Sequence, residues 1–564
     1  MKTVKPASPD RPHDGDTRGA LPIALALTGL TILPAILHPW IRTRADSWFH
    51  AAIVAEIERA GVPPQDPYFA GLPLQYMWFF HAMLAAVRKV APVDTFTLMV
   101  LVNALALMAL ILVSAHLAEW IARRTGDEPA RAARTAAYVV PLGLGVLVWL
   151  VMPIRALKAL AGKSGGMEQL AEAFRWRPLD IGTIRTFLSD FGSVPFFLNK
   201  FLVGTAYGLA LVAFLVYLAA VLSFIERPRL KPLLVVMPAL FLALMFHPVV
   251  GFTTVAVSGI TGVVLLVLGP RRGGQSFGAV AAWGGSVVVS LLLAVPYLVG
   301  VTRGKPGGQL VPIHFDWVNV AGLLVGVLFV AIAAAGLARR LWREGTPWGR
   351  MLVTWIIATL VFASFIRLPG PNTTDKFTYL LYLPPAILAG VALSSRWRGM
   401  AGLLAALAIL APANLLAWAS YLGEPDYSRR PVEVVEAYDW LRANTPRDAI
   451  VLDSRERCDV LVSVPRRQFW GREAYAEQWG YDEGEMARRR YLRDQLVGPS
   501  GIAARNGPAI DTGPLAATGA PVFVIVRAED VGAAAFEAWG EAHPQFSEAH
   551  RSAGIRLFQL LRLE

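Results

Sequence analysis

The sequence predicts an α-helical protein with about 11 transmembrane helices and a small α/β domain at its C-terminal end. Of its 564 residues, 55% are hydrophobic and 17% are charged, whereas soluble chains average about 25% charged residues. Uncharged apolar runs of roughly 18 to 25 residues, long enough to cross a bilayer, recur between Leu21 and Leu422. From Gly423 onward, charged residues become frequent. Disorder and a disulfide scaffold are excluded, the latter because Cys458 is the single cysteine.

The apolar runs define the predicted spans. In chain order they are 20–40, 95–120, 134–153, 198–224, 232–247, 249–268, 277–301, 316–338, 350–366, 377–394 and 400–421. The first follows a basic tail, 1–18, and has no small-residue cleavage site, so we expect a retained signal anchor.

The segment 73–90 decides the predicted topology. It contains Gln75, His81, Arg88 and Lys89, a mixture that favours an amphipathic helix on the membrane surface. With this segment on the surface, the Arg clusters near 123–134, 227–231, 271–272, 339–350 and 396–398 all fall on one side. That side is predicted to be the cytoplasm, and it includes the N-terminus.

The long and chemically varied loops then lie on the opposite, extracytoplasmic side. They are 41–94, 154–197, 302–315, 367–376 and the domain 423–564. The net charge of +12 is explained by this topology. It does not indicate nucleic-acid binding, because the basic residues are scattered and have no zinc-ligand spacing.

The C-terminal segment has the pattern of a small α/β domain. Helical spacing covers 431–444 and 486–496, β-rich runs cover 449–452, 521–526 and 554–561, and 498–520 is rich in turn residues. The run Arg488 to Arg490 fits either a solvated helix face or a contact with an anionic acceptor.

The first outer loop holds the main catalytic candidates. Asp46 and His50 are four residues apart, so they share one face of a helix. Asp46 could act as a general base or hold a divalent cation such as Mg²⁺ or Mn²⁺, and His50 could share a proton or bind phosphate. The alternative is that Asp46 caps the helix and His50 is an interfacial residue. The sequence does not identify any other cofactor.

Other outer residues are candidates for substrate binding. Asp66 could orient the acceptor or form a turn before Pro67, and Asp190 could supply a second carboxylate. His247 breaks a long apolar run, as either a functional residue or a simple turn. Lys376, with Arg367 nearby, suits a lipid phosphate because lysine is a mobile point charge at headgroup level.

Phe196 and Phe197, which follow Asp190, form an aromatic pair. They could contact a prenyl chain, and an amphipathic re-entry segment explains them equally well.

The order of these features resembles the GT-C glycosyltransferases. A cytoplasmic N-terminus, a first span, an outer loop opening with an acidic residue, amphipathic surface helices, many spans and an outer C-terminal domain all match. The resemblance implies a polyprenyl-phosphate sugar donor, a glycan, lipid or protein acceptor, and contact with membrane lipids. It gives Asp46 the role of the catalytic acidic residue. Many members have paired acidic residues there, whereas Ser47 follows Asp46 here, so metal use stays open.

Three rival functions have distinct signatures. A transporter or flippase of lipid-linked glycans should place ionisable residues within its spans and show related halves. An O-antigen-type polymerase or ligase should carry its dominant outer loop between late spans. A mere anchor for the soluble domain would not need so many spans.

Overall fold

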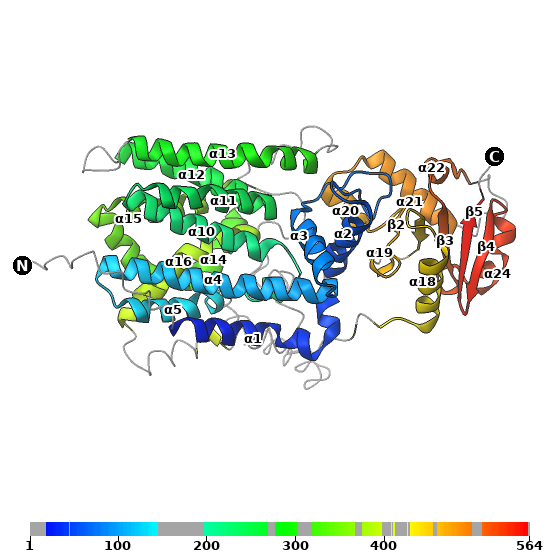
Figure 1. Ribbon diagram of the computed structural model, residues 1–564, viewed down its shortest axis with the longest axis horizontal. Coiled ribbons are helices and arrows are strands. Elements are labelled where there is room, and N and C mark those ends of the chain that lie inside the picture. The colour runs from blue at the N-terminus through cyan, green and yellow to red at the C-terminus, as the bar shows by residue number, and fades with distance from the viewer. Residues whose placement is uncertain are drawn as a thin grey trace, which may run out of the picture.

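In a computed structural model the protein is mostly helical, with a five-stranded sheet near its C-terminus. Figure 1 shows the apolar helices side by side along the long axis and the sheet at the opposite end of the molecule. The residues described are 19–43, 46–144, 197–202, 204–268, 277–302, 315, 317–366, 375–396, 408, 410–411, 426, 429–454, 459–498 and 510–561.

Ten long helices form the bundle within the described ranges. They are α1 (Leu21–Leu37), α4 (Thr95–Thr125), α5 (Pro129–Leu142), α10 (Tyr207–Glu226), α11 (Leu230–Phe246), α12 (Pro248–Leu268), α13 (Phe277–Thr302), α14 (Trp317–Glu344), α15 (Pro347–Phe365) and α16 (Asp375–Arg396). Six of them, α4, α10, α12, α13, α15 and α16, are long and apolar enough to cross a membrane, and α1 and α11 are shorter apolar helices. The chain is therefore an integral, multi-pass membrane protein.

Helix α16 lies at the centre of the bundle. Its Tyr382 donates a hydrogen bond to the carbonyl oxygen of Val139 in α5 at 2.7 Å. A Cβ at Gly390 would lie 2.7 Å from the Cα of Ala136, so only glycine permits this close helix contact. In contrast, Leu105 and Ile332 are 59% and 67% exposed, as expected for side chains that face lipid.

Some predicted span limits were wrong. The run 198–224 is broken: the short helix α9 (Asn199–Leu202) precedes α10, which begins at Tyr207. Helix α14 continues to Glu344, so part of the Arg cluster expected in a loop is helical. The second half of 134–153 and almost all of 400–421 lie outside the described residues.

The segment 46–94 forms two helices between the bundle and the sheet (Figure 1). After a 3₁₀ turn (η2, Pro39–Thr43), the chain forms α2 (Ser47–Ala60) and α3 (Phe79–Val90). The helix predicted over 73–90 therefore begins six residues later. Pro73 instead pairs with Gln65 in an isolated β-bridge, and its carbonyl oxygen accepts a hydrogen bond from Tyr481 Oη.

The C-terminal domain has the predicted α/β character. Its elements are α18 (Val432–Asn444), β1 (Ile450–Asp453), α19 (Asp459–Ser463), β2 (Arg467–Gln468), α20 (Glu473–Trp479), α21 (Glu483–Val497), α22 (Gly513–Ala516), β3 (Val522–Arg527), α23 (Ala528–Val531), α24 (Ala533–Ala542), β4 (Phe546–Ser552) and β5 (Ile555–Leu560). The strand order is β2-β1-β3-β5-β4, with β1 parallel to both neighbours and β5 antiparallel to both of its own. The elements that were not predicted are strands β2 and β4 and helices α19, α20, α22, α23 and α24, and α22 lies within the run 498–520 expected to be a loop.

Candidate active site between the bundle and the C-terminal domain

Asp46 occupies the N-cap position of α2, but its side chain makes no capping hydrogen bond. The Asp46 side chain therefore does not cap the helix, and this part of the alternative interpretation is wrong. The residue is exposed, and Tyr475 of α20 donates a long hydrogen bond of 3.4 Å to Oδ1. Among the described residues, none forms an ion pair with Asp46.

His50 lies one turn further along α2 and is buried. Its Nδ1 is 2.8 Å from Nε2 of His81 in α3, and the two rings stack at 5.0 Å. Burial lowers the pKa of His50 to about 4, although the Asp46 carboxylate acts in the opposite direction. Burial and the neighbouring His50 hold the pKa of His81 well below its ordinary value. Both rings are therefore neutral at pH 7. Of the two catalytic candidates Asp46 and His50, Asp46 is the one with an acidic side chain.

Aromatic rings from three segments enclose this position. Phe49 contacts Tyr76 at 4.7 Å, Tyr475 at 4.9 Å and Trp479 at 5.1 Å. Burial, followed by the charge of Asp46, raises the pKa of Tyr76. Trp479 and Tyr475 stack almost in parallel on α20. The C-terminal domain thus forms one wall of the site.

A second group of residues gathers at the junction of α11 and α12. His247, the single residue between these helices, is buried against the ring of Tyr207 at 5.0 Å. The ring of Tyr207 contacts Tyr379 of α16 at 5.5 Å, and Lys200 Nζ lies 5.7 Å from the centre of the Tyr379 ring. Tyr207 also donates a hydrogen bond of 2.5 Å to the carbonyl oxygen of Lys376.

Lys200 and His247 are 47 positions apart in the sequence, and Lys376 follows His247 by 129 positions. The structure brings together His247 and Lys376, as two of the predicted binding residues, and adds Lys200 from the short helix α9. Two lysines in one place suit an anionic group such as a phosphate.

The N-terminal end of α3 lies between the two groups. Phe79 contacts Phe246 at 5.3 Å, and Phe246 immediately precedes His247. His81, two residues after Phe79, contacts His50. The group that contains Asp46 and the group that contains Lys200 and Lys376 therefore both lie near the start of α3.

Asp66 is fully buried and does not face an open cavity. Its carboxylate accepts hydrogen bonds from Tyr481 Oη and, at 2.7 Å, from the backbone N–H of Tyr68. Burial raises the pKa of Asp66 to about 7, against the effect of these hydrogen bonds. The predicted turn is thus present. The Asp66 side chain connects the segment 46–94 to the C-terminal domain.

Further contacts complete this attachment. The backbone of 67–70 pairs with Gln468 of β2, with two hydrogen bonds of 2.8 Å. Arg489 of α21 is 5% exposed and donates hydrogen bonds of 3.0 Å to the carbonyl oxygens of Ala70 and Phe469. The middle arginine of the run is therefore a structural residue, and neither prediction for that run fits it.

Other predicted residues fall outside the site or outside the described ranges. Arg367 and Asp190 lie outside the described residues, as does Phe196. Phe197 is fully buried and packs against Phe201, Tyr379 and Tyr382, so it belongs to the core and does not offer a prenyl-binding surface. Among the described residues, no three His, Cys, Asp or Glu side chains form a group that could hold a metal ion, so Mg²⁺ or Mn²⁺ has no ligand set there.

Sequence reasoning missed Tyr475 and Arg472 as neighbours of Asp46. Arg472 lies over the ring of Tyr475, 5.2 Å from its centre, and Tyr475 contacts Asp46. The available signal was the spacing of Tyr475 and Trp479, which places two aromatic rings on one face of a helix. Nothing in the sequence indicated which surface that face would meet.

A separate pocket lies beside α20 in the C-terminal domain. Its volume is about 700 Å³, and its lining includes Glu473, Ala476, Glu483, Ala487 and Arg490. Glu473 forms an ion pair with Arg490. Glu473 and Ala476, which line the pocket, and Tyr475, which contacts Asp46, all belong to α20.

No protein-family model and no curated protein matches the sequence. Solved structures do match. The structure of ArnT from Cupriavidus metallidurans bound to undecaprenyl phosphate superposes with a TM-score of 0.51 and 14% identity, over 96% of this chain and 98% of that chain. The apo oligosaccharyltransferase from Archaeoglobus fulgidus gives 0.41 and 13%, over 94% and 73%. The arabinofuranosyltransferase AftD from Mycobacteria gives 0.43 and 16%, over 97% and 40%. The likeness to ArnT, which extends over nearly all of both chains, shows that this chain has the GT-C fold.

Proposed function

We propose that the protein is a membrane glycosyltransferase that moves a sugar from a polyprenyl-phosphate donor to a glycan, lipid or protein acceptor. The observation that carries the proposal is the pairing of an exposed carboxylate, Asp46, with a basic group, Lys376 and Lys200, across the start of α3. The GT-C fold supports it, because the ArnT structure of the same fold was solved with undecaprenyl phosphate bound.

The proposed topology follows the charge pattern of the sequence. Residues 1–18 form a cytoplasmic tail, 19–422 form the catalytic membrane domain, and 423–564 form an extracytoplasmic domain. The reaction then takes place on the outer face of the cytoplasmic membrane, where Asp46 and the C-terminal domain meet.

The proposed mechanism is a direct displacement. The donor phosphate binds beside Lys376 and Lys200, whose charges stabilise the phosphate as it leaves with the bonding electrons. Asp46 accepts the proton of the acceptor hydroxyl, and the hydroxyl oxygen forms the new bond to the anomeric carbon. Burial lowers the pKa values of His50 and His81, so both rings are neutral at pH 7 and neither forms an ion pair with the Asp46 carboxylate.

The pocket beside α20 is the proposed site for the distal part of the acceptor. Its three carboxylates, Glu473, Asp482 and Glu483, outnumber the single Arg490, so it disfavours an anionic ligand. The carboxylates and the arginine could accept and donate hydrogen bonds to sugar hydroxyls. An acceptor that passes the edge of α20 would then present one hydroxyl to Asp46 and rest its remaining residues in the pocket.

The test is reconstitution of the full chain in liposomes with a panel of labelled polyprenyl-phosphate sugars and candidate acceptors. We expect the label to move to an acceptor and the unlabelled lipid phosphate to be released. Parallel reactions with EDTA decide whether a divalent cation is needed. Movement of an intact lipid-linked glycan across the bilayer, without cleavage of the sugar-phosphate bond, would show a flippase and contradict the proposal.

A further inference from the structure

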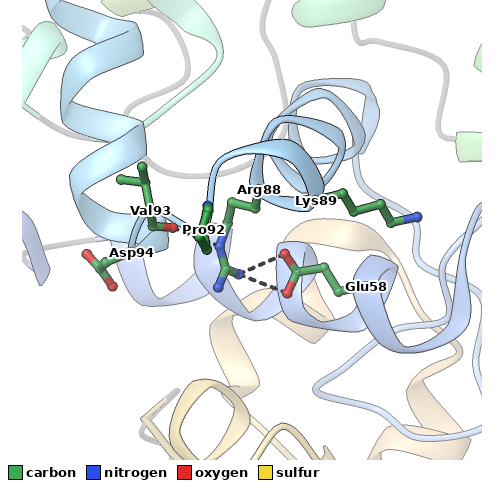
Figure 2. Close-up of a pocket in the computed structure, with 6 residues that line it drawn as sticks. All are labelled: Glu58, Arg88, Lys89, Pro92, Val93 and Asp94. Atoms are coloured by element: carbon green, nitrogen blue, oxygen red, sulfur yellow. Dashed lines mark hydrogen bonds and ion pairs between the residues drawn. The ribbon is translucent and has the colours of Figure 1, made fainter.

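A pocket at the far end of α2 from Asp46 is used by no step of the proposed reaction. It has a volume of about 460 Å³ and is formed where α2 and α3 end and α4 begins (Figure 2). Its lining residues are Glu58, Arg88, Lys89, Pro92, Val93 and Asp94. At 1.5 Å per residue, Glu58 lies roughly 16 Å along the helix from Ser47, which places the pocket well away from the catalytic candidates.

An ion pair fixes the middle of the pocket. Arg88 Nη1 lies 2.8 Å from both carboxylate oxygens of Glu58, and Arg88 Nε donates a hydrogen bond of 3.0 Å to the carbonyl oxygen of Val93. These bonds tie the ends of α2 and α3 to the turn before α4. Arg88 and Glu58 therefore largely neutralise each other.

Two further charges lie at opposite ends of the pocket. Figure 2 shows the Asp94 carboxylate on one side of the ion pair and the Lys89 ammonium extending on the other. Asp94 accepts a hydrogen bond of 2.9 Å from the backbone of Thr97 with Oδ2, which leaves Oδ1 for another donor. Lys89 is exposed and has no partner among the described residues. The pocket as a whole is neutral, with separated positive and negative ends.

Exposed apolar side chains lie near the pocket. Leu101 and Leu105 of α4 are 46% and 59% exposed, and Leu101 is about 10 Å from Asp94 along the helix. Val90, next to Lys89, is 89% exposed. Apolar side chains next to charged ones at a helix end are typical of the membrane interface.

We propose that this pocket binds the headgroup of a zwitterionic phospholipid that carries a primary ammonium, such as phosphatidylethanolamine. The ammonium donates to Asp94, and the phosphate accepts from Lys89. An anionic lipid fits less well, because its charge would meet two carboxylates as well as two basic groups. A choline headgroup has the same charges but no N–H to donate to Asp94.

The test is native mass spectrometry of the full-length, detergent-solubilised protein titrated with phosphatidylethanolamine, phosphatidylcholine and phosphatidylglycerol. We expect phosphatidylethanolamine to bind most tightly. Lys89→Ala should weaken its binding about fivefold, the effect of losing one exposed charge contact. Lys231→Ala, an exposed lysine on α11, is the matched control and should leave binding unchanged. Because Lys89 has no partner among the described residues, its replacement does not endanger folding.

A second variant tests the ammonium end of the pocket. Asp94→Asn keeps an N-cap side chain for α4, since Asn caps helices as well as Asp does, but it removes the negative charge. The preference for phosphatidylethanolamine over phosphatidylcholine should fall, with the fold intact. The proposal is overturned if phosphatidylglycerol binds the native protein most tightly, or if Lys89→Ala and Lys231→Ala behave alike.

Discussion

The two ends of helix α2 carry carboxylates in opposite surroundings. At its start, which we call the reactive end, Asp46 is exposed, and the described residues give it one long hydrogen bond from Tyr475. Near its C-terminus, which we call the anchoring end, Glu56 is 4% exposed and is bound by Arg59 at 2.7 Å and by Arg467 of the C-terminal domain at 2.9 Å.

This difference distinguishes a carboxylate that stabilises the structure, Glu56, from the carboxylate that we propose takes part in the reaction, Asp46. A buried carboxylate is stable only when cationic partners compensate for its lost hydration, so Glu56 is committed to holding the C-terminal domain. An exposed carboxylate without an ion pair keeps its ability to accept a proton or a hydrogen bond. The C-terminal domain thus contacts both ends of α2, through an ion pair with Glu56 at one end and through aromatic rings and one long hydrogen bond at the other.

The largest expected effect is at the reactive end. Asp46→Asn should lower the transfer rate by about a hundredfold or more, since a general base contributes about 10² to 10⁴. Stability and donor affinity should change little. The measurement is the initial rate in proteoliposomes, with Glu58→Gln, the exposed carboxylate near the other end of α2, as the control. Equal rates for Asp46→Asn and the native protein would remove Asp46 from the mechanism.

The anchoring end should respond in stability. Glu56→Gln leaves Arg59 and Arg467 partly buried without a counter-charge, which costs about 3 kcal/mol. The thermal midpoint of the solubilised protein should fall and proteolysis should release the C-terminal domain more readily. Glu58→Gln, on the same helix, removes a more exposed ion pair with Arg88 of α3 and should cost less than about 1 kcal/mol. Equal losses for the two variants would mean that Glu56 is not an anchor.

Asp66 offers a pH test of the same attachment. Its pKa is raised by burial from 3.8 to about 7, so the folded state holds a proton that the unfolded state has released. The stability that this proton contributes is present below pH 4 and is lost as the pH rises towards 7, at up to about 1.4 kcal/mol per pH unit. Relative to the native protein, Asp66→Asn should therefore gain in thermal midpoint between pH 5 and pH 8. A constant difference across this range would contradict the raised pKa.

The basic group opposite the reactive end should affect donor binding. Lys376→Ala removes a charged contact with the donor phosphate and should raise the KM for the donor about tenfold. The rate at saturation should fall much less than in Asp46→Asn. Lys231→Ala again serves as the control. A change in acceptor KM without a change in donor KM would move Lys376 to the acceptor side of the site.

The smallest effect concerns the pocket beside α20. Ala487→Trp fills that pocket from an exposed position on α21 and should raise the acceptor KM about fivefold, with donor KM unchanged. Ala534→Trp, on an exposed face of α24, is the matched control. If the two variants have the same acceptor KM, the pocket does not take part in acceptor binding.

Local patterns predicted much of this arrangement. The helix containing Arg88 and Lys89, the helix over 432–444 and the strands around 450 and 522 all follow from hydrophobic periodicity and turn residues within short windows. The break after Leu202 and the start of α3 were mispredicted, because the contacts of Tyr207 and Pro73 with distant segments override the local apolar pattern.

The sequence by itself determined that the chain is a multi-pass membrane protein, because span length and charge depletion are set by the bilayer and are visible in any window of about twenty residues. It also singled out Asp46, His247 and Lys376 as separate candidates. Only the tertiary structure decided that Tyr475 meets Asp46 across 429 positions, that His50 meets His81, and that Lys376 approaches His247. Such contacts depend on how whole helices and domains pack, and no local pattern encodes which distant surface a side chain will face.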